Sequence, residues 1–150
     1  MRRWLRAAGL LVAVLGLDQL TKAAVRHWIS PGDEDPVLPF VSIVHVRNDG
    51  VAFGFLSSAG DVVVWFVVAA LVALVVFFWR QPERAGLWVP TGLLLGGALG
   101  NLLDRARHGY VTDFVKLPLW PAFNVADVAI TVGVLALLYV LEAPRERARH

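Results

Sequence analysis

Apolar residues fill four long blocks of the chain. Every position from Val62 to Trp79 is apolar, and about 18 such residues in succession are typical of a helix that crosses a membrane. The other three blocks contain only a few polar positions. The pattern therefore predicts four transmembrane helices, at about residues 7–29, 62–79, 87–105 and 125–142.

The first block has a second interpretation, as a secretory signal peptide. It begins with the basic stretch MRRWLR and continues with the apolar stretch AAGLLVAVLGL, a typical order of signal-peptide regions. Polar residues follow at once, namely Asp18, Gln19, Thr21 and Lys22, without a clean small-x-small cleavage site. We therefore expect this block to be retained as a span.

The segments between the blocks predict little regular structure. Residues 30–39, SPGDEDPVLP, are rich in turn formers, and we expect Asp33, Glu34 and Asp35 to lie in a turn. FVSIVHV, from Phe40 to Val46, has the β-branched content of a short strand. Since no internal repeat or linker is visible, residues 1–150 are expected to form a single membrane-embedded domain.

Basic residues predict the orientation of the spans. Arginines cluster before the first span, between the second and third, and after the fourth: Arg2, Arg3, Arg6, Arg80, Arg84, Arg145, Arg147 and Arg149. The positive-inside rule places these segments, and both termini, in the cytoplasm. The bias is modest, since the other side holds Arg26, Arg47, Arg105, Arg107 and Lys116.

Composition excludes several kinds of chemistry. The chain has no cysteine, which excludes disulfides, thiolate metal sites and a cysteine nucleophile. None of its four histidines lies in a metal-ligand spacing such as HExxH, so we expect no metal and no cofactor. The net charge is only +2, and the basic residues lie at helix ends, so nucleic acid is not an expected partner.

Polar residues in the outer halves of the spans are expected to converge. A charge in hydrocarbon costs about 2.5–3.5 kcal/mol on insertion scales, so such groups usually face the bundle interior. Helical spacing places Asp18 with Lys22 on one face of the first span. The other groups lie on the third span, in the outer loop and at the start of the fourth span: Asn101, Asp104, Arg105, Asp113, Asn124 and Asp127. The GxxxG formed by Gly96 and Gly100 predicts close packing of the third span.

Each of these groups also has an ordinary structural interpretation. Asn124 with Asp127 is typical of a helix N-cap with an acid in the first turn. The other acids can form simple ion pairs or turns: Asp18 with Lys22, Asp104 with Arg105, and Asp113 in its loop. Convergence of several independent segments on one surface favours a functional site over these separate interpretations.

Paired carboxylates indicate one particular chemistry. When two carboxyl groups lie about 3 Å apart they share a proton, so that one acts as a base on water while the other donates to a carbonyl oxygen. A serine nucleophile is less favoured, because Ser57 and Ser58 lack the glycine pattern of a nucleophile elbow. A Ser–Lys dyad with Lys22 is conceivable, but no spacing specifies it.

Five blocks in order carry a family resemblance. They are DQLTK at residues 18–22, NDGVAFGF at 48–55, GGALGNLLDR at 96–105, VTDF at 111–114 and FNVAD at 123–127. With these blocks the chain resembles, over nearly its whole length, the lipoprotein signal peptidases (signal peptidase II).

The resemblance implies a mainly α integral membrane fold, with four transmembrane helices and a small β-containing cradle on the extracytoplasmic face. It implies an intramembrane aspartyl endopeptidase of the bacterial cytoplasmic (inner) membrane, acting at the outer face among membrane lipids. Its substrates would be diacylglyceryl-modified prolipoproteins, cut just before the lipidated cysteine.

By motif, the resemblance assigns Asp113 and Asp127 as the catalytic pair. It maps five residues to the lining of the site: Asn48, Gly50, Asn101, Arg105 and Asn124. It maps Asp18, Lys22 and Asp104 to supporting positions. Asp49 and Val51 depart from the residues common in the family.

Two other classes remain open from the residues alone. Intramembrane Asp, Lys and Arg also mark ion paths, as in a proton- or ion-coupled transporter subunit, although the inverted repeats of many transporters are not visible. An assembly subunit with structural polar pairs is the third class. Peptidase activity in detergent distinguishes the three.

Overall fold

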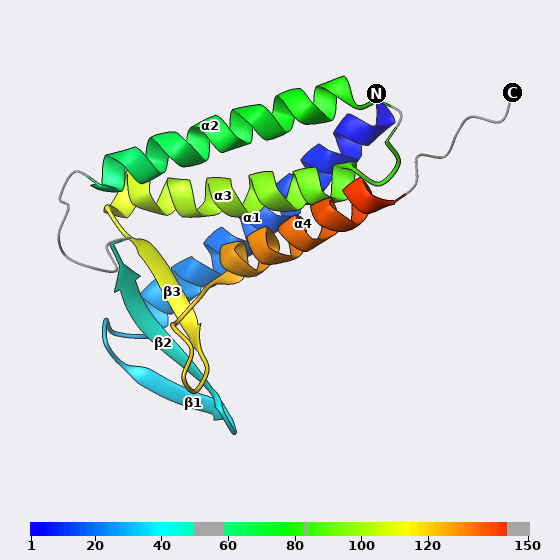
Figure 1. Ribbon diagram of the computed structural model, residues 1–150. Helices are drawn as coiled ribbons and strands as arrows, with labels where there is room; N and C mark the ends of the chain where they lie inside the picture. Colours follow the sequence, from blue (N-terminus) through cyan, green and yellow to red (C-terminus); the bar gives the residue numbers. More distant parts are fainter. Residues whose placement is uncertain (50–58, 83, 144–150) are drawn as a thin grey trace, which may run out of the picture.

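The described part of the chain forms four helices and a small sheet. The structure is a computed structural model that describes residues 1–49, 59–82 and 84–143. The elements follow in the order α1 (Arg2–Trp28), β1 (Glu34–Leu38), β2 (Val41–Asn48), α2 (Ala59–Arg80), α3 (Trp88–His108), β3 (Val111–Lys116) and α4 (Val125–Glu142). Figure 1 shows the helices running side by side, with the sheet attached at one end of the bundle.

Helix α3 lies between α1 and α4 and approaches both closely. A Cβ atom at Gly96 would lie 2.9 Å from the Leu11 carbonyl oxygen of α1, and one at Gly97 would lie 2.6 Å from the Ala126 carbonyl oxygen of α4. No side chain fits at such distances, so glycine permits the helices to touch. The helix ends at Gly109, whose φ of 80° is a left-handed conformation that glycine adopts readily.

The outside of the bundle is apolar while its interior holds buried charges. Large apolar side chains are exposed on α1, α2 and α4, among them Leu20, Phe66 and Leu135. Asp18, Lys22 and Asp104 are fully buried. By length and composition, α1 and α4 are each sufficient to cross a membrane. An extensive apolar surface around polar interior groups is the arrangement expected in a bilayer.

The sheet is antiparallel, with β2 in the centre between β1 and β3. The expected strand at Phe40–Val46 is confirmed as β2, displaced by one residue at its start and two at its end. The expectation that Glu34 and Asp35 lie in a turn was wrong, because both pair with β2 as part of β1. This strand is an exposed edge, where Pro36 is tolerated and no apolar alternation is required.

Asp113 also differs from its expected place. It lies in β3 rather than in a loop, and it pairs with Val46 of β2. Pairing satisfies the backbone groups of this short segment, and it fixes the direction in which the Asp113 side chain points.

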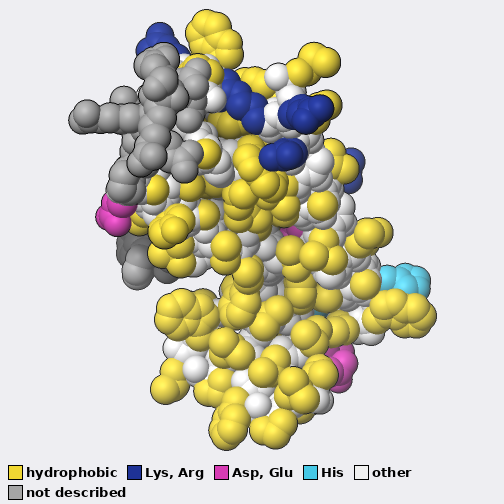
Figure 2. All heavy atoms as spheres, turned by 90° about the vertical axis from the view of Figure 1, so that its right-hand side faces the viewer, with side chains coloured by type: hydrophobic (Ala, Val, Ile, Leu, Met, Phe, Trp, Pro, Cys, Tyr) yellow, Lys and Arg dark blue, Asp and Glu magenta, His cyan; other side chains and the backbone are white. Residues whose placement is uncertain are grey.

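Basic groups gather at the end of the bundle opposite the sheet. Arg3 donates to the carbonyl oxygen of Gln81 at 2.9 Å, and Arg84 donates to that of Val140 at 3.1 Å. Figure 2 faces this end, with Lys and Arg side chains grouped in its upper part. The start of α1 and the end of α4 therefore lie on the same side of the bundle.

Candidate active site

The start of α4 carries a capping box. The Asn124 side-chain oxygen accepts from the Asp127 N–H at 2.9 Å, and Asp127 Oδ2 accepts from the Asn124 N–H at 3.1 Å. The helix-cap interpretation of this pair is therefore confirmed. It leaves Asn124 Nδ2 and Asp127 Oδ1 available for contacts with other elements.

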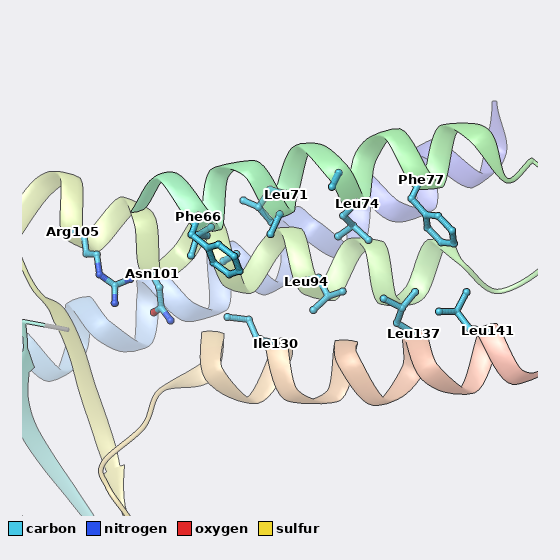
Figure 3. Close-up of a pocket in the computed structure, with 14 residues that line it drawn as sticks. Phe66, Leu71, Leu74, Phe77, Leu94, Asn101, Arg105, Ile130, Leu137 and Leu141 are labelled. Atoms are coloured by element: carbon cyan, nitrogen blue, oxygen red, sulfur yellow. The ribbon is translucent and has the colours of Figure 1, made fainter. Parts of the chain in front are cut away.

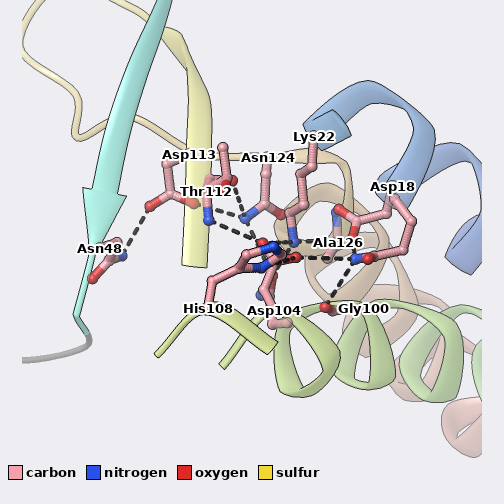
Figure 4. Close-up of polar contacts among 12 residues, drawn as sticks. Asp18, Lys22, Asn48, Gly100, Asp104, His108, Thr112, Asp113, Asn124 and Ala126 are labelled. Carbon is pink, nitrogen blue, oxygen red and sulfur yellow. Dashed lines mark hydrogen bonds and ion pairs between the residues drawn. The ribbon is translucent and has the colours of Figure 1, made fainter. Parts of the chain in front are cut away.

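Two asparagines link the carboxylates of Asp113 and Asp127, and a third binds Asp113. Asp113 accepts from Asn48 Nδ2 at 2.8 Å and from Asn124 Nδ2 at 2.7 Å. Asp127 Oδ1 accepts from Asn101 Nδ2 at 2.9 Å, and Asn101 Oδ1 accepts from Asn124 Nδ2 at 3.2 Å. The structure thus brings together Asn48 from β2, Asn101 from α3, Asp113 from β3, and Asn124 with Asp127 from α4. Figure 4 shows the Asn48, Asp113 and Asn124 side of this network.

The environment of Asp113 favours its protonated form. Burial raises the pKa of the Asp113 carboxyl above its ordinary value, and the negative charge of Asp127 raises it further. Hydrogen bonds from Asn48 and Asn124 lower the pKa and partly oppose these effects. Asn124 hydrogen-bonds to both carboxylates, which places Asp113 and Asp127 on either side of it.

A second network, whose members Asp18, Lys22 and Asp104 are fully buried, holds the elements around the carboxylates. Lys22 Nζ lies 2.9 Å from Asp18 and 3.4 Å from Asp104, and it donates to Asn101 Oδ1 at 2.8 Å. Asp18 accepts from the Ala126 N–H of α4 at 2.9 Å, and Asp104 accepts from the Thr112 N–H of β3 at 3.0 Å. The expected Asp18–Lys22 ion pair is confirmed, and these contacts join α1, α3, β3 and α4 (Figure 4).

Sequence reasoning missed two members of this network. Gln19 Nε2 donates to Asp18 at 3.1 Å and to the Gly100 carbonyl oxygen at 3.2 Å. Arg26 donates to the Thr112 hydroxyl at 3.0 Å and lies 3.5 Å from Asp104. Arg26 continues the spacing of four from residues 18 and 22, so that spacing was a usable signal.

Arg105 does not share the surroundings of Asp104. With Asn101, Arg105 forms the polar end of an apolar groove of about 630 Å³ between α2, α3 and α4 (Figure 3). The remaining lining is apolar: Phe66, Val67, Ala70, Leu71, Ala73, Leu74, Phe77, Leu94, Ala98, Ile130, Leu137 and Leu141. Among the described residues, the contacts of Asp104 are to Gln19, Lys22, Arg26, His108 and Thr112. The Asp104–Arg105 pair is not among them, and Gly50 and Val51 lie outside the described residues.

Two carboxylates bound by amide donors, beside the polar end of an apolar groove, indicate a class of enzyme. Such a pair can supply the acid and the base of an aspartic peptidase, and the apolar exterior of the bundle suits a membrane.

Comparison with known proteins identifies the family. Residues 10–142 match the family model described as signal peptidase (SPase) II. The chain is 42% identical over 137 residues to the lipoprotein signal peptidase of Moorella thermoacetica, covering 90% of this chain and 91% of that protein. It is 43% identical over 152 residues to that of Syntrophotalea carbinolica, covering 94% and 93%.

Solved structures of similar sequence share this fold. A solved bacterial membrane enzyme superposes with a TM-score of 0.85 at 34% identity, covering 91% of this chain and 92% of that one. A second superposes with a TM-score of 0.83 at 32% identity, covering 96% and 93%. The chain belongs to the signal peptidase II family of lipoprotein signal peptidases, which are aspartic endopeptidases of bacterial membranes. Membership of this family excludes the transporter and assembly-subunit interpretations.

Proposed function

We propose that Asp113 and Asp127 are the catalytic pair with which this chain removes signal peptides from diacylglyceryl-modified prolipoproteins. The observation that carries the assignment is the asparagine network between the two carboxylates. Asn124 donates to Asp113, while Asn101 donates to Asp127. In the described chain, the other buried acids, Asp18 and Asp104, are engaged by Lys22 instead.

The proton positions give each carboxylate a role. Asp113, with its raised pKa, carries the proton and donates it to the oxygen of the scissile carbonyl. Asp127 removes a proton from water, and the water oxygen bonds to the carbonyl carbon. The tetrahedral intermediate then collapses: the C–N bond breaks, Asp127 gives its proton to the leaving amine, and Asp113 takes back the hydroxyl proton. The dyad returns to its starting state.

The groove supports a substrate that is apolar over most of its length. Its apolar walls suit the hydrophobic segment of a signal peptide. Asn101, at its polar end, donates a hydrogen bond to Asp127. Arg105 presents fixed guanidinium donors that suit the carbonyl oxygens of an extended backbone. The diacylglyceryl group stays in the bilayer, where each buried CH₂ contributes about 0.8 kcal/mol.

Topology is the second part of the proposal. Both termini face the cytoplasm and the sheet lies at the outer face of the bacterial cytoplasmic membrane. Support comes from Arg3 and Arg84, which lie at the end of the bundle away from the dyad. Since the chain has no cysteine, single cysteines can report this directly. In intact cells an impermeant reagent should label Lys116→Cys and leave Glu142→Cys unlabelled; the reverse pattern would refute this orientation.

Substitution of the dyad tests the catalytic assignment. Asp113→Asn and Asp127→Asn should each lower turnover of a lipidated prolipoprotein by at least about 10²–10⁴-fold, the usual contribution of general acid–base catalysis. Asp35→Asn, at an exposed position of β1, is the matched control and should retain activity. Circular dichroism in detergent establishes that each variant is folded. Turnover near the parent rate by either dyad variant would overturn the assignment, and Asp104 would be tested next.

A further inference from the structure

Two exposed apolar residues adopt an unfavourable backbone conformation. Phe40, between β1 and β2, has a φ of 69°, and Leu119, after β3, has a φ of 62°; in the described part of the chain they are the non-glycine residues with positive φ. Their exposed fractions are 78% and 105%. Glycine or asparagine suits such positions better than a large apolar residue. Backbone strain of this kind is often found where the side chain has a function.

Both residues lie at the same end of the sheet. Ser42 near the start of β2 pairs with Lys116 at the end of β3, which places the turn at Phe40 beside the loop that contains Leu119. The two segments line one cavity of about 430 Å³. Other exposed apolar side chains surround them, and together they form what we call the apolar tip: Val37, Leu38, Phe40, Leu119 and Trp120.

One ion pair lies beside the apolar tip. The acids of the β1 segment, Asp33, Glu34 and Asp35, come before its apolar half. Glu34 forms an ion pair with Lys116, the charged residue at the end of β3. An apolar end backed by a neutralised pair suits the interface between lipid and water, where an unpaired charge is costly.

The apolar tip continues a surface that already faces lipid. Figure 1 shows the sheet extending sideways from the end of the bundle, beyond α4. In Figure 2, which looks along the helices from their other end, hydrophobic side chains cover much of the lower lobe. The hydrophobic surface of the lower lobe is therefore directed toward the lipid layer that the helices span. Val128, Val132 and Leu135 of α4 are also exposed and are lipid-facing in a membrane protein.

We propose that the apolar tip inserts into the phospholipid leaflet on the active-site side, at the depth of the glycerol groups and first acyl carbons. Strands β2 and β3 connect the apolar tip to the dyad. Asn48 ends β2 and Asp113 lies near the start of β3, at the opposite end from the tip. At about 3.3 Å per residue the separation is roughly 20 Å. Insertion of the tip therefore fixes the height of Asp113 above the bilayer.

Single-cysteine fluorescence tests the insertion, and it requires no peptidase activity. Leu119→Cys is labelled with an environment-sensitive probe in phosphatidylglycerol–phosphatidylethanolamine liposomes. Val132→Cys serves as a lipid-facing reference and Asp33→Cys as a water-facing reference on the same sheet. We expect lipids with a nitroxide near the glycerol to quench the probes at Leu119→Cys and Val132→Cys, and an aqueous nickel chelate to quench only that at Asp33→Cys.

Two results would overturn the proposal. One is quenching of the Leu119→Cys probe by the nickel chelate to the extent seen at Asp33→Cys. The other is shielding of the probe from both quenchers, together with disulfide cross-linking between copies of the unlabelled Leu119→Cys variant under an added oxidant, because a second copy would then cover the apolar tip.

Activity measurements test separately whether insertion of the apolar tip affects the active site. The double variant Leu119→Ser, Trp120→Ser should lose turnover in liposomes and keep it in detergent, where no bilayer plane exists. An equal loss of turnover in both media, or no loss in either, would refute the proposal that the apolar tip fixes the height of Asp113 above the bilayer. Failure of the dyad assignment would instead appear in Asp113→Asn and Asp127→Asn, so the two proposals fail independently.

Discussion

Substitution of Gly97 should displace the start of α4 and with it the base of the dyad. The added Cβ of Gly97→Ala would lie 2.6 Å from the Ala126 carbonyl oxygen, whereas ordinary contacts begin at 3.4 Å. The helices must therefore separate locally by about 0.8 Å. Overpacking of this kind costs about 1–3 kcal/mol, against a gain of about 0.5–1 kcal/mol from replacing glycine within a helix. We expect a net loss of stability of about 0.5–2 kcal/mol.

The effect on turnover should be larger than the effect on stability. Asp127 follows Ala126 directly, and displacements near 1 Å can cost about 10²-fold in rate. We expect kcat for a lipidated prolipoprotein in detergent to fall by about ten- to a hundredfold. Gly16→Ala is the matched control: nothing lies within 4 Å of its Cβ, so stability should rise slightly and kcat should not change. A Gly97→Ala enzyme as active as the parent would refute the claim that this helix contact positions the dyad.

Three further predictions concern charge and hydrogen bonding. The Asp113 pKa is raised, so activity that needs its proton is lost as pH rises through that pKa. Asn48→Ala removes a donor that lowers the pKa, and the basic limb of the kcat profile should move to higher pH; a limb that stays or moves down contradicts this. Lys22→Met leaves buried Asp18 without its cation and removes one of the cations beside buried Asp104, and it should cost about 3–5 kcal/mol in detergent unfolding followed by circular dichroism. This is more than we expect for Arg26→Met, whose side chain is partly exposed. Arg105→Ala should lower kcat/KM by about 10–100-fold and Arg105→Lys should recover only part of it; full recovery would show that a point charge suffices.

Local helical spacing was enough to predict part of the site. Asp18 and Lys22 lie one turn apart, so their ion pair follows from α-helix geometry. The same geometry explains why Asp104 and Arg105 have different neighbours. Consecutive helix residues point about 100° apart at 3.6 residues per turn, so one carboxylate faces α1 and β3 while the guanidinium faces the groove.

Strand pairing could not be predicted in the same way. β1 has acids, Pro36 and no apolar alternation, and it is a strand only because β2 pairs with it. β3 likewise depends on β2, which lies more than sixty residues earlier in the chain. For the same reason, spacing alone cannot show that Asn101 and Asn124 donate to Asp127 and Asp113, because each of those bonds depends on how separate elements pack.

The contacts of the buried network involve helices that are synthesised one after another. Asp18 and Lys22 neutralise each other within α1, so these two central charges of the helix cancel before their other partners are synthesised. Their other partners arrive late: Asn101 and Asp104 with α3, and the Ala126 N–H with α4. Asp113 and Asp127, the proposed catalytic pair, therefore come together only when α4 docks. A chain truncated before α4 would remain in the membrane without the capacity to cut.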